Sequence, residues 1–377
     1  MKQTRTPVLR EMSRWSALAG VLLLIAGSSV PPLGYHIYLA FASVAAGRIE
    51  RDVTYGTVDG VALKLDLYYP KSIADPVPIA VYVHGGGWTA GDKSGGAGLR
   101  EVQELVDRGY LVAAINYRLA PSHKFPAQIE DVKCAIRCLR ANAVKYGADP
   151  KRIGAWGGSA GGHLVALLGV TDSSAGFDGS GGCLDQSSRV QAVVDMFGPT
   201  DLTRLFSGAN PRLLETVFGT TDRNAEILKK ASPVNHVSID DPPFLILHGE
   251  LDKLVPPSQS QIFHEKLKGT GVPTTLVIVK NAGHGFSQAG SPISPSREEI
   301  TKMVADFFDQ HLKQSSRTET LITSQTAVLS RSYAYGVGSG LLIVVAVTLA
   351  AITAGALLLR KQKDPSPSIR GKEGTLS

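Results

Sequence analysis

Ser159 stands inside a run of small residues, Gly157-Gly158-Ser159-Ala160-Gly161. One apolar run, residues 153–156, ends just before it, and a second one, residues 163–168, begins just after it. We therefore expect a strand, a tight turn and a helix to meet at this serine, because small neighbours let the backbone turn sharply. Such a turn lifts the hydroxyl clear of the sheet edge and sets the positive end of a helix beneath it. The pattern predicts a serine nucleophile.

A serine hydroxyl attacks a carbonyl carbon only when a base accepts its proton and an acid orients that base. His284 lies in a Gly-flanked loop just past the apolar run that ends at Val279, and we assign it as the base. Asp252 also follows a buried run, and we assign it as the orienting acid. The chain order Ser159, Asp252, His284 is one of the orders in which such triads occur.

Other acids and histidines compete for these two roles. Glu250 is the alternative acid, but it follows a His-Gly pair by one residue, which points it less well toward His284. His163 begins the helix after the serine turn and His248 ends a strand, so we expect neither to reach Ser159.

Attack on a carbonyl places negative charge on its oxygen, so hydrogen-bond donors must already point at that position. The sequence His84-Gly-Gly-Gly-Trp88 follows an apolar run over residues 79–83. Its glycines leave bare backbone amides that can approach a substrate closely. Together with the amide of Ala160, we expect them to form an oxyanion hole. The combined pattern predicts acyl transfer.

The elements that would position these groups follow from the hydrophobic pattern. Residues 53–57 and 62–68 alternate around an Asp59-Gly60 turn, which predicts an antiparallel hairpin at a sheet edge. Strands that are apolar on both faces belong to a central parallel sheet. The runs of this kind are 79–83, 111–115, 153–156, 190–194, 244–247 and 275–279. With helices expected over 127–146 and 298–312, the fold class is α/β, a doubly wound and mostly parallel sheet with antiparallel lead-in strands.

Two polar segments interrupt this alternation. Residues 172–188 are rich in Gly and Ser, and residues 200–233 mix polar residues with short apolar pieces. We expect both to lie beyond strand ends and to wall the mouth of the site.

Charge and cysteine content exclude two other classes of protein. The net charge is +6, but many of the basic residues lie at the two ends of the chain, in residues 1–14 and 360–377, so nucleic-acid binding is not expected. Three cysteines give no even-numbered disulfide framework. Because they lack His or acidic partners at short spacing, we expect no metal site.

Both ends of the chain carry long uncharged stretches, which predict flanking transmembrane helices and a membrane location with the catalytic domain on the extracytoplasmic side. A cleaved signal peptide is the alternative for the first stretch. The predicted segments are a basic cytoplasmic leader, 1–14; an N-terminal membrane anchor or signal peptide, 15–47; a catalytic domain, 48–313; a polar linker, 314–331; a transmembrane helix, 332–359; and a basic cytoplasmic tail, 360–377.

The middle of the chain resembles the α/β-hydrolase superfamily. The residues that carry this resemblance are His84-Gly-Gly-Gly-Trp88, Asn116-Tyr-Arg-Leu-Ala-Pro121, Gly157-Gly-Ser-Ala-Gly-Gly162, the turn at Asp252, and Gly283-His-Gly-Phe286. The pattern is most similar to the esterase/lipase branch related to hormone-sensitive lipase, and within it to feruloyl and acetyl-xylan esterase-like enzymes. The resemblance implies Ser159 as nucleophile, His284 as base, Asp252 as third member, and the amides of Gly86, Gly87 and Ala160 as oxyanion donors.

These observations predict a serine carboxylester hydrolase that forms an acyl-enzyme and needs no metal or organic cofactor. The expected partners are short-chain or glycan-linked acyl esters as substrate and the lipid bilayer, with no nucleic acid. Two alternatives remain at this point: an amide hydrolase, either arylformamidase-like or a peptidase, since the same triad cleaves amides; and an inactive, membrane-tethered binding protein on a hydrolase scaffold.

Overall fold

The structure, a computed structural model, describes residues 47–73, 75–204 and 206–313. Its strands are β1 Ile49–Val58, β2 Val61–Tyr68, β3 Val77–Val83, β4 Leu111–Ile115, β5 Ala148–Gly158, β6 Ala192–Met196, β7 Phe244–Gly249 and β8 Thr274–Val279. Its α-helices are α1 Glu101–Asp107, α2 Ala127–Ala141, α3 Ala160–Gly169, α4 Pro211–Phe218, α5 Glu226–Lys230, α6 Ser258–Thr270 and α7 Arg297–Phe308.

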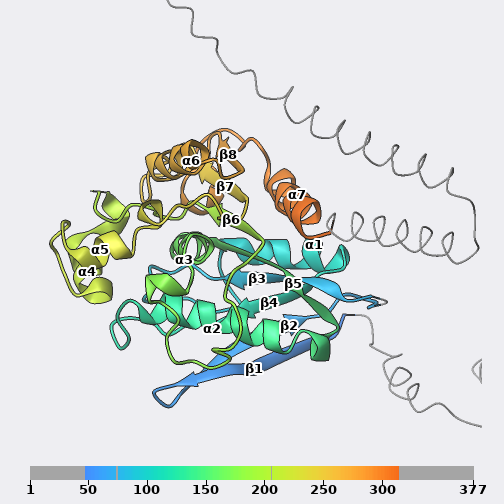
Figure 1. The fold of residues 1–377 in the computed structure, drawn as a ribbon. Helices are drawn as coiled ribbons and strands as arrows, with labels where there is room; N and C mark the ends of the chain where they lie inside the picture. The colour runs from blue at the N-terminus through green and yellow to red at the C-terminus, as the bar shows by residue number, and fades with distance from the viewer. Residues whose placement is uncertain (1–46, 74, 205, 314–377) are drawn as a thin grey trace, which may run out of the picture. The chain divides into compact units, whose positions relative to one another are not determined.

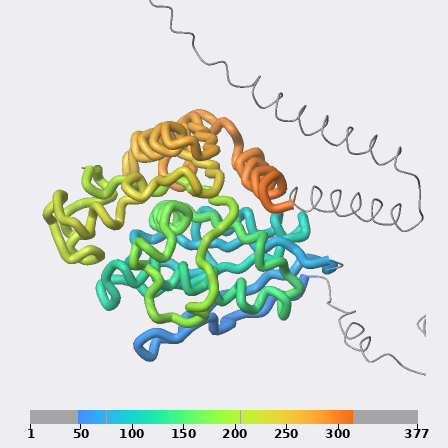
Figure 2. The backbone as a smooth tube through the Cα atoms, viewed as in Figure 1, coloured from blue at the N-terminus to red at the C-terminus, as the bar shows by residue number. Residues whose placement is uncertain are grey.

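The eight strands form one sheet in the order β1-β2-β4-β3-β5-β6-β7-β8. β1 pairs with β2, and β2 with β4, antiparallel, whereas every pair from β4 to β8 is parallel. The chain progresses from the β1 edge at the bottom of the view to α6 and β8 at its top (Figure 2). The parallel strands thus send their carboxyl ends to one edge, where ligands bind in open sheets of this kind.

Helices cover both faces of the sheet (Figure 1). On one face, side chains of α2, α3 and α6 join the larger hydrophobic cluster, exemplified by Ile129, Leu164 and Phe263. On the other face, α1 and α7 contribute Leu105 and Phe308 to a second cluster. The expected doubly wound arrangement with antiparallel lead-in strands is therefore present, with layers as in other α/β folds.

Each predicted strand lies on an observed one. The lead-in hairpin turns at Asp59 and Gly60, both with positive φ (51° and 79°), as an Asp-Gly hairpin requires. The predicted run over residues 190–194 starts two residues before β6. Gln191, just before the strand, already donates its amide to the Ile153 carbonyl of β5 at 2.8 Å.

Flanking transmembrane helices were part of the expected fold, and this part of the prediction is wrong. In residues 47–73, 75–204 and 206–313, no helix combines the length and the apolar composition needed to cross a membrane. The predicted membrane location is corrected by the same finding, and nothing in the described residues supports the lipid bilayer as a partner. That prediction rested on the length and apolar composition of two uncharged stretches and on their basic flanks. Both stretches, 15–47 except for Gly47 and 332–359, lie outside the described residues, as do 1–14, 314–331 and 360–377.

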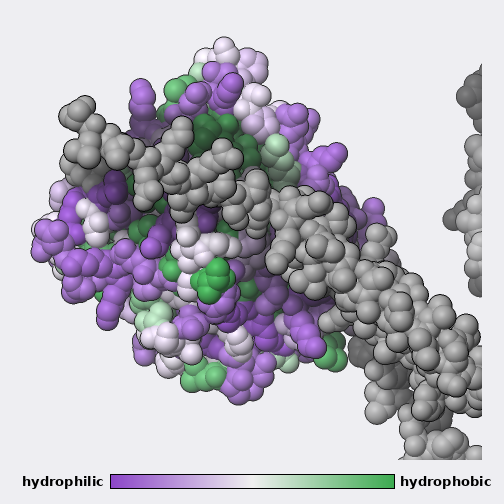
Figure 3. Space-filling view, turned by 45° about the horizontal axis from the view of Figure 1, so that its top comes forward, coloured by the Kyte–Doolittle hydropathy of each residue, from purple (hydrophilic) through white to green (hydrophobic). Residues whose placement is uncertain are grey.

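The face in Figure 3 is mainly hydrophilic, with hydrophobic side chains in small separate patches. Most large apolar side chains of the described residues are buried in the two clusters that flank the sheet. Leu254, which is 45% exposed, is an exception. It lies beside the site described next.

Candidate active site

Ser159 occupies the sharp turn between β5 and α3. Its φ and ψ are 59° and −121°, a positive φ that costs energy in any residue with a side chain. The turn is held by the Ser159 amide, which donates to the Met196 carbonyl at 2.9 Å. A Cβ on Gly161 would lie 2.1 Å from the Val83 carbonyl oxygen, so this neighbour of the serine has to be small. The local sequence therefore forms the strained elbow that it predicts.

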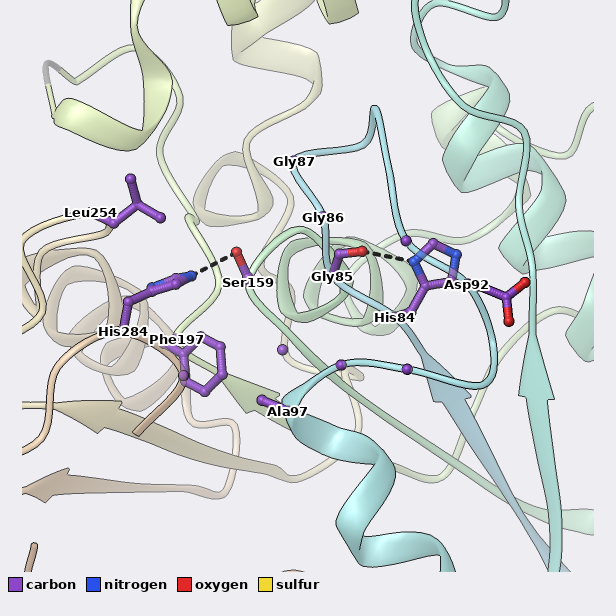
Figure 4. A pocket seen from close by; sticks show the side chains of 15 residues that line it. His84, Gly85, Gly86, Gly87, Asp92, Ala97, Ser159, Phe197, Leu254 and His284 are labelled. Atoms are coloured by element: carbon purple, nitrogen blue, oxygen red, sulfur yellow. Dashed lines mark hydrogen bonds between the residues drawn. The ribbon is translucent and has the colours of Figure 1, made fainter. Parts of the chain in front are cut away.

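His284 and Asp252 lie in loops that follow β8 and β7, and these loops bring them to Ser159. The Oγ of Ser159 is 3.0 Å from Nε2 of His284, as the dashed line in Figure 4 marks. Nδ1 of the same ring is 2.7 Å from Oδ2 of Asp252. When Asp252 is ionised, Nδ1–H of His284 donates to it, which leaves Nε2 to accept the serine proton. The geometry is that of a hydrogen-bonded serine, imidazole and carboxylate chain.

Asp252 is 4% exposed and keeps its charge through hydrogen bonds. Burial alone would raise its pKa, but the nearby imidazole of His248 and hydrogen bonds from His284 and the Val255 amide outweigh burial and hold the pKa well below its usual range. Its second oxygen, Oδ1, accepts from the amides of Leu254 and Val255 at 2.9 and 3.0 Å. The carboxylate is therefore fixed in direction as well as in charge.

The competing residues are placed elsewhere. Glu250 accepts from the Asn281 amide at 3.3 Å and is not hydrogen-bonded to His284. His163 is fully buried, where Nδ1 accepts from the Trp88 indole at 3.1 Å. His248 is also buried, and it faces Asp252 rather than Ser159.

The glycine loop after β3 reaches Ser159 from the opposite side (Figure 4). Gly86 and Gly87 have φ of 117° and 61°. A Cβ on Gly86 would lie 2.1 Å from the Ala90 carbonyl oxygen, so only glycine fits there. In the chain that the structure describes, no recorded hydrogen bond occupies the amide of Gly86 or Gly87. Both residues line the space in front of Ser159, as does Ala160, the first residue of α3.

Two pockets meet at Ser159. The larger has a volume of about 500 Å³ and is lined by His284, Gly285, Phe197 and the loop from His84 to Ala97. The smaller has about 200 Å³ and is lined mainly by apolar side chains. These include Trp88, Phe206, Leu213, Leu254 and Val255. Gly87, Ser159 and Leu254 border both pockets.

The sequence analysis did not identify two of the residues that line the pockets, Phe197 and Leu254. Phe197 follows β6 directly, and its ring packs edge-on against His284 with centroids 5.0 Å apart. Leu254 comes two residues after Asp252. Their positions just past strand ends were a usable signal, since the sheet's carboxyl edge carries the site. Of the two polar segments expected at the mouth, residues 200–233 contribute Phe206 and Leu213, whereas no residue of 172–188 lines either pocket.

The described residues were also compared with the requirements of a metal site. Among residues 47–73, 75–204 and 206–313, no group of three or more His, Cys, Asp or Glu side chains is placed to hold an ion.

This sheet, with a serine elbow at its carboxyl edge and a histidine and an acid on the following loops, defines an α/β-hydrolase. The BD-FAE family model matches residues 65–267, more than half of the chain. The chain belongs to the BD-FAE family of α/β-hydrolase esterases, as the sequence resemblance predicts.

Individual relatives agree with this assignment. The chain is 36% identical over 250 residues to a probable carboxylic ester hydrolase of Mycobacterium tuberculosis, LipM, covering 64% of this chain and 57% of LipM. It spans about 60% of the length of the first curated relatives it matches.

Two solved structures are similar over the described body. A truncated carbohydrate esterase from gut microbiota has a TM-score of 0.62 and 30% identity, covering 71% of this chain and 98% of that one. A thermophilic esterase of Thermogutta terrifontis, solved with propionate bound, has a TM-score of 0.57 and 30% identity, covering 70% and 93%.

Proposed function

We propose that the protein is a serine carboxylester hydrolase in which Ser159 is the nucleophile, His284 the general base and Asp252 the acid that orients it. The observation that carries this proposal is the unbroken pair of contacts, 3.0 Å from Ser159 to His284 and 2.7 Å from His284 to Asp252. The esterase names of the relatives support the reaction class.

In this mechanism His284 accepts the Ser159 proton as Oγ attacks the ester carbonyl. The charge that develops on the carbonyl oxygen is stabilised by the amides of Gly86, Gly87 and Ala160. The protonated imidazole, paired with Asp252, then donates its proton to the leaving alcohol. Water, activated by the same histidine, releases the acid from the acyl-enzyme and regenerates the serine.

The two pockets divide the substrate between them. A general acid must lie within hydrogen-bonding distance of the leaving oxygen, and His284 lines only the larger pocket. The alcohol therefore occupies the larger pocket, and the acyl chain lies in the smaller one, among Phe206, Leu213 and Val255.

The volumes of the two pockets support a particular class of substrate. The smaller pocket, about 200 Å³, has the volume of about seven water molecules, which suits a short acyl chain. The larger one, about 500 Å³, has the volume of ordinary small-molecule sites and accepts a sugar-sized alcohol. Propionate in one relative and the carbohydrate esterase name of another support short acyl esters of glycans.

Replacement of the nucleophile tests the mechanism. We expect Ser159→Ala to lose hydrolysis of p-nitrophenyl acetate by about 10⁴-fold or more, together with covalent labelling by a fluorophosphonate. Full retained hydrolysis would exclude this mechanism.

A substrate panel tests the reaction class. On one preparation, we expect acetyl esters of a xylo-oligosaccharide to be cleaved faster than the decanoyl esters and faster than a formanilide or a peptide. Preferred cleavage of the formanilide or the peptide would replace the ester assignment with amide hydrolysis.

A further inference from the structure

A second histidine lies behind Asp252. His248 is at the end of β7, four residues before Asp252, and its side chain is fully buried. Its Nε2 is 2.8 Å from the Val255 carbonyl oxygen and 3.5 Å from Oδ2 of Asp252. Its Nδ1 is 2.6 Å from the Ser260 hydroxyl, in the first turn of α6. Asp252 thus lies between two imidazole rings, and the proposed mechanism uses only one of them.

The partners of His248 decide which of its nitrogens carries the proton. A carbonyl oxygen can only accept, so Nε2 must donate to Val255. In the neutral ring Nδ1 then accepts from the Ser260 hydroxyl. The Nε2–H therefore faces the Val255 carbonyl and the Asp252 carboxylate together. Ser260 fixes this tautomer from the far side of the ring.

This contact ties together the turn that holds the acid. Asp252 Oδ1 accepts from the amides of Leu254 and Val255, and the carbonyl of Val255 accepts from His248. Oδ2 faces His284 at 2.7 Å and His248 at 3.5 Å. If His248 were absent, the buried carboxylate would lose one of the donors around Oδ2. The turn would keep the bond from the Asp252 amide to Gly249 but lose its side-chain attachment to β7.

We propose that His248 is a positioning residue for the triad: its Nε2–H, oriented by Ser260, holds the Asp252 carboxylate in the direction from which it can orient His284. This inference depends on the proposed function, since it assigns a role to His248 only through Asp252.

The charges around the ring agree with this role. The imidazole of His248, 3.5 Å from Oδ2, is one of the neighbours that outweigh burial and keep the pKa of Asp252 low. The titratable groups that face His248 are Asp252, on the loop after β7, and Asp195, on β6. His284, on the loop after β8, faces Asp252 from the other side. Burial raises the pKa of Asp195 to about 6, so this neighbour is ionised at neutral pH and adds to the negative charge near the ring.

The central experiment is a double-mutant cycle in the full chain with p-nitrophenyl acetate as substrate. We expect His248→Leu to lower kcat by about 10- to 100-fold with KM nearly unchanged, because a donor that faces the buried carboxylate at 3.5 Å is lost. We expect the low-pH fall of kcat to begin at higher pH, because removing this donor leaves more negative charge on the Asp252 carboxylate, which favours the protonated form of the imidazole paired with it. His248→Gln, which keeps an N–H donor, should recover part of kcat.

The cycle separates positioning from a merely structural role. The rate of fluorophosphonate labelling is measured in all four variants, since it stays measurable when turnover is slow. In an Asp252→Ala background, where His248 has no carboxylate to hold, His248→Leu should cost less than about twofold in this rate, against about 10-fold or more in the wild-type background. An equal loss in both backgrounds would overturn the proposal. Phe263→Leu, a cavity variant in the core under α6, is the stability control: it should lower Tm and leave kcat unchanged.

Two further outcomes distinguish failure of this inference from failure of the proposed function. If His248→Leu keeps wild-type kcat while Asp252→Asn remains inactive, the role of His248 is excluded and the triad stands. If Asp252→Asn keeps activity, the triad itself is excluded.

A second variant covers the case in which His248→Leu does not fold. Ser260→Ala removes only the hydroxyl that orients the His248 ring, and kcat should fall about 3- to 10-fold with the same shift of the pH profile. An unchanged profile in Ser260→Ala would also overturn the proposal.

Discussion

The two sides of Ser159 are built differently. On the sheet side, Asp252 and His284 lie three and five residues past the ends of β7 and β8, and hydrogen bonds between side chains and backbone fix them. On the other side, Phe206 and Leu213 come from the long excursion between β6 and β7 and contribute apolar volume. Reacting groups must be positioned to within tenths of an ångström, and short loops on a parallel sheet provide this accuracy. A pocket wall needs only to leave a space of the right size.

This contrast predicts that substitutions on the sheet side change the rate and those in the excursion change selectivity. The largest effect should come from Asp252→Asn. The Asn oxygen would keep accepting from the Leu254 and Val255 amides, so its NH2 group would face His284 and donate to Nδ1. The ring is then held in the wrong tautomer and kcat falls by about 10⁴-fold. Measurement of kcat for p-nitrophenyl acetate checks this, and a loss below tenfold would contradict the proposed role of the acid.

Gly86→Ala should have the next largest effect. The new Cβ would lie 2.1 Å from the Ala90 carbonyl oxygen on a backbone with φ of 117°, so the glycine loop must move. We expect kcat to fall by about 10²- to 10³-fold, as when one oxyanion donor is lost. Gly269→Ala, on α6 with no atom within 4 Å of its new Cβ, is the matched control and should keep the wild-type rate.

Asp195→Asn should change stability instead of rate. Asp195 is fully buried, its Oδ2 has no partner among the described residues, and burial raises its pKa to about 6. The folded state therefore favours the neutral acid, and stability falls as pH rises from about 4 through about 6. Two pKa units correspond to about 3 kcal/mol, which the amide avoids. Thermal denaturation should show a Tm gain over wild type at pH 8 that disappears at pH 4, and a gain equal at both pH values would refute this account.

Leu213→Ala should have the smallest effect, on chain-length selectivity. Removing this side chain enlarges the smaller pocket, and each added methylene buried there contributes about 0.8 kcal/mol. We expect the ratio of kcat/KM for p-nitrophenyl hexanoate over acetate to rise about tenfold. Leu184→Ala, on the other excursion and 60% exposed, is the control and should leave the ratio unchanged. A higher acetate rate without a change in ratio would place the acyl chain elsewhere.

The sequence predicted more of the sheet side than of the excursion. Each apolar run fell on a strand, because a strand buried on both faces has a composition that needs no knowledge of its neighbours. The choice of Ser159, Asp252 and His284 followed from their places after such runs, and the structure brings the three within hydrogen-bonding distance.

Long-range packing is what the sequence did not reveal. Residues 172–188 and 200–233 look alike in composition, yet the first lies against α2, where the buried Lys133 donates to the carbonyls of Thr171 and Asp172 at 3.0 Å. In the sequence His248 is indistinguishable from an ordinary strand residue. The folded turn after β7 brings the Asp252 carboxylate and the Val255 carbonyl to its Nε2. The prediction of membrane helices came from the local composition and length of two apolar stretches, and no helix in the described ranges meets the requirement for crossing a membrane.

The sequence by itself determined where the strands lie along the chain and predicted which serine, acid and histidine form the site, since the elbow needs small residues and buried strands need apolar ones. Only the tertiary structure decided the distances among these groups, the division of the space around Ser159 into a larger and a smaller pocket, and the contact of His248 with Asp252. The physical reason is that each of these depends on residues far apart in the chain, whose approach is set by how the crossover helices pack the strands into one sheet.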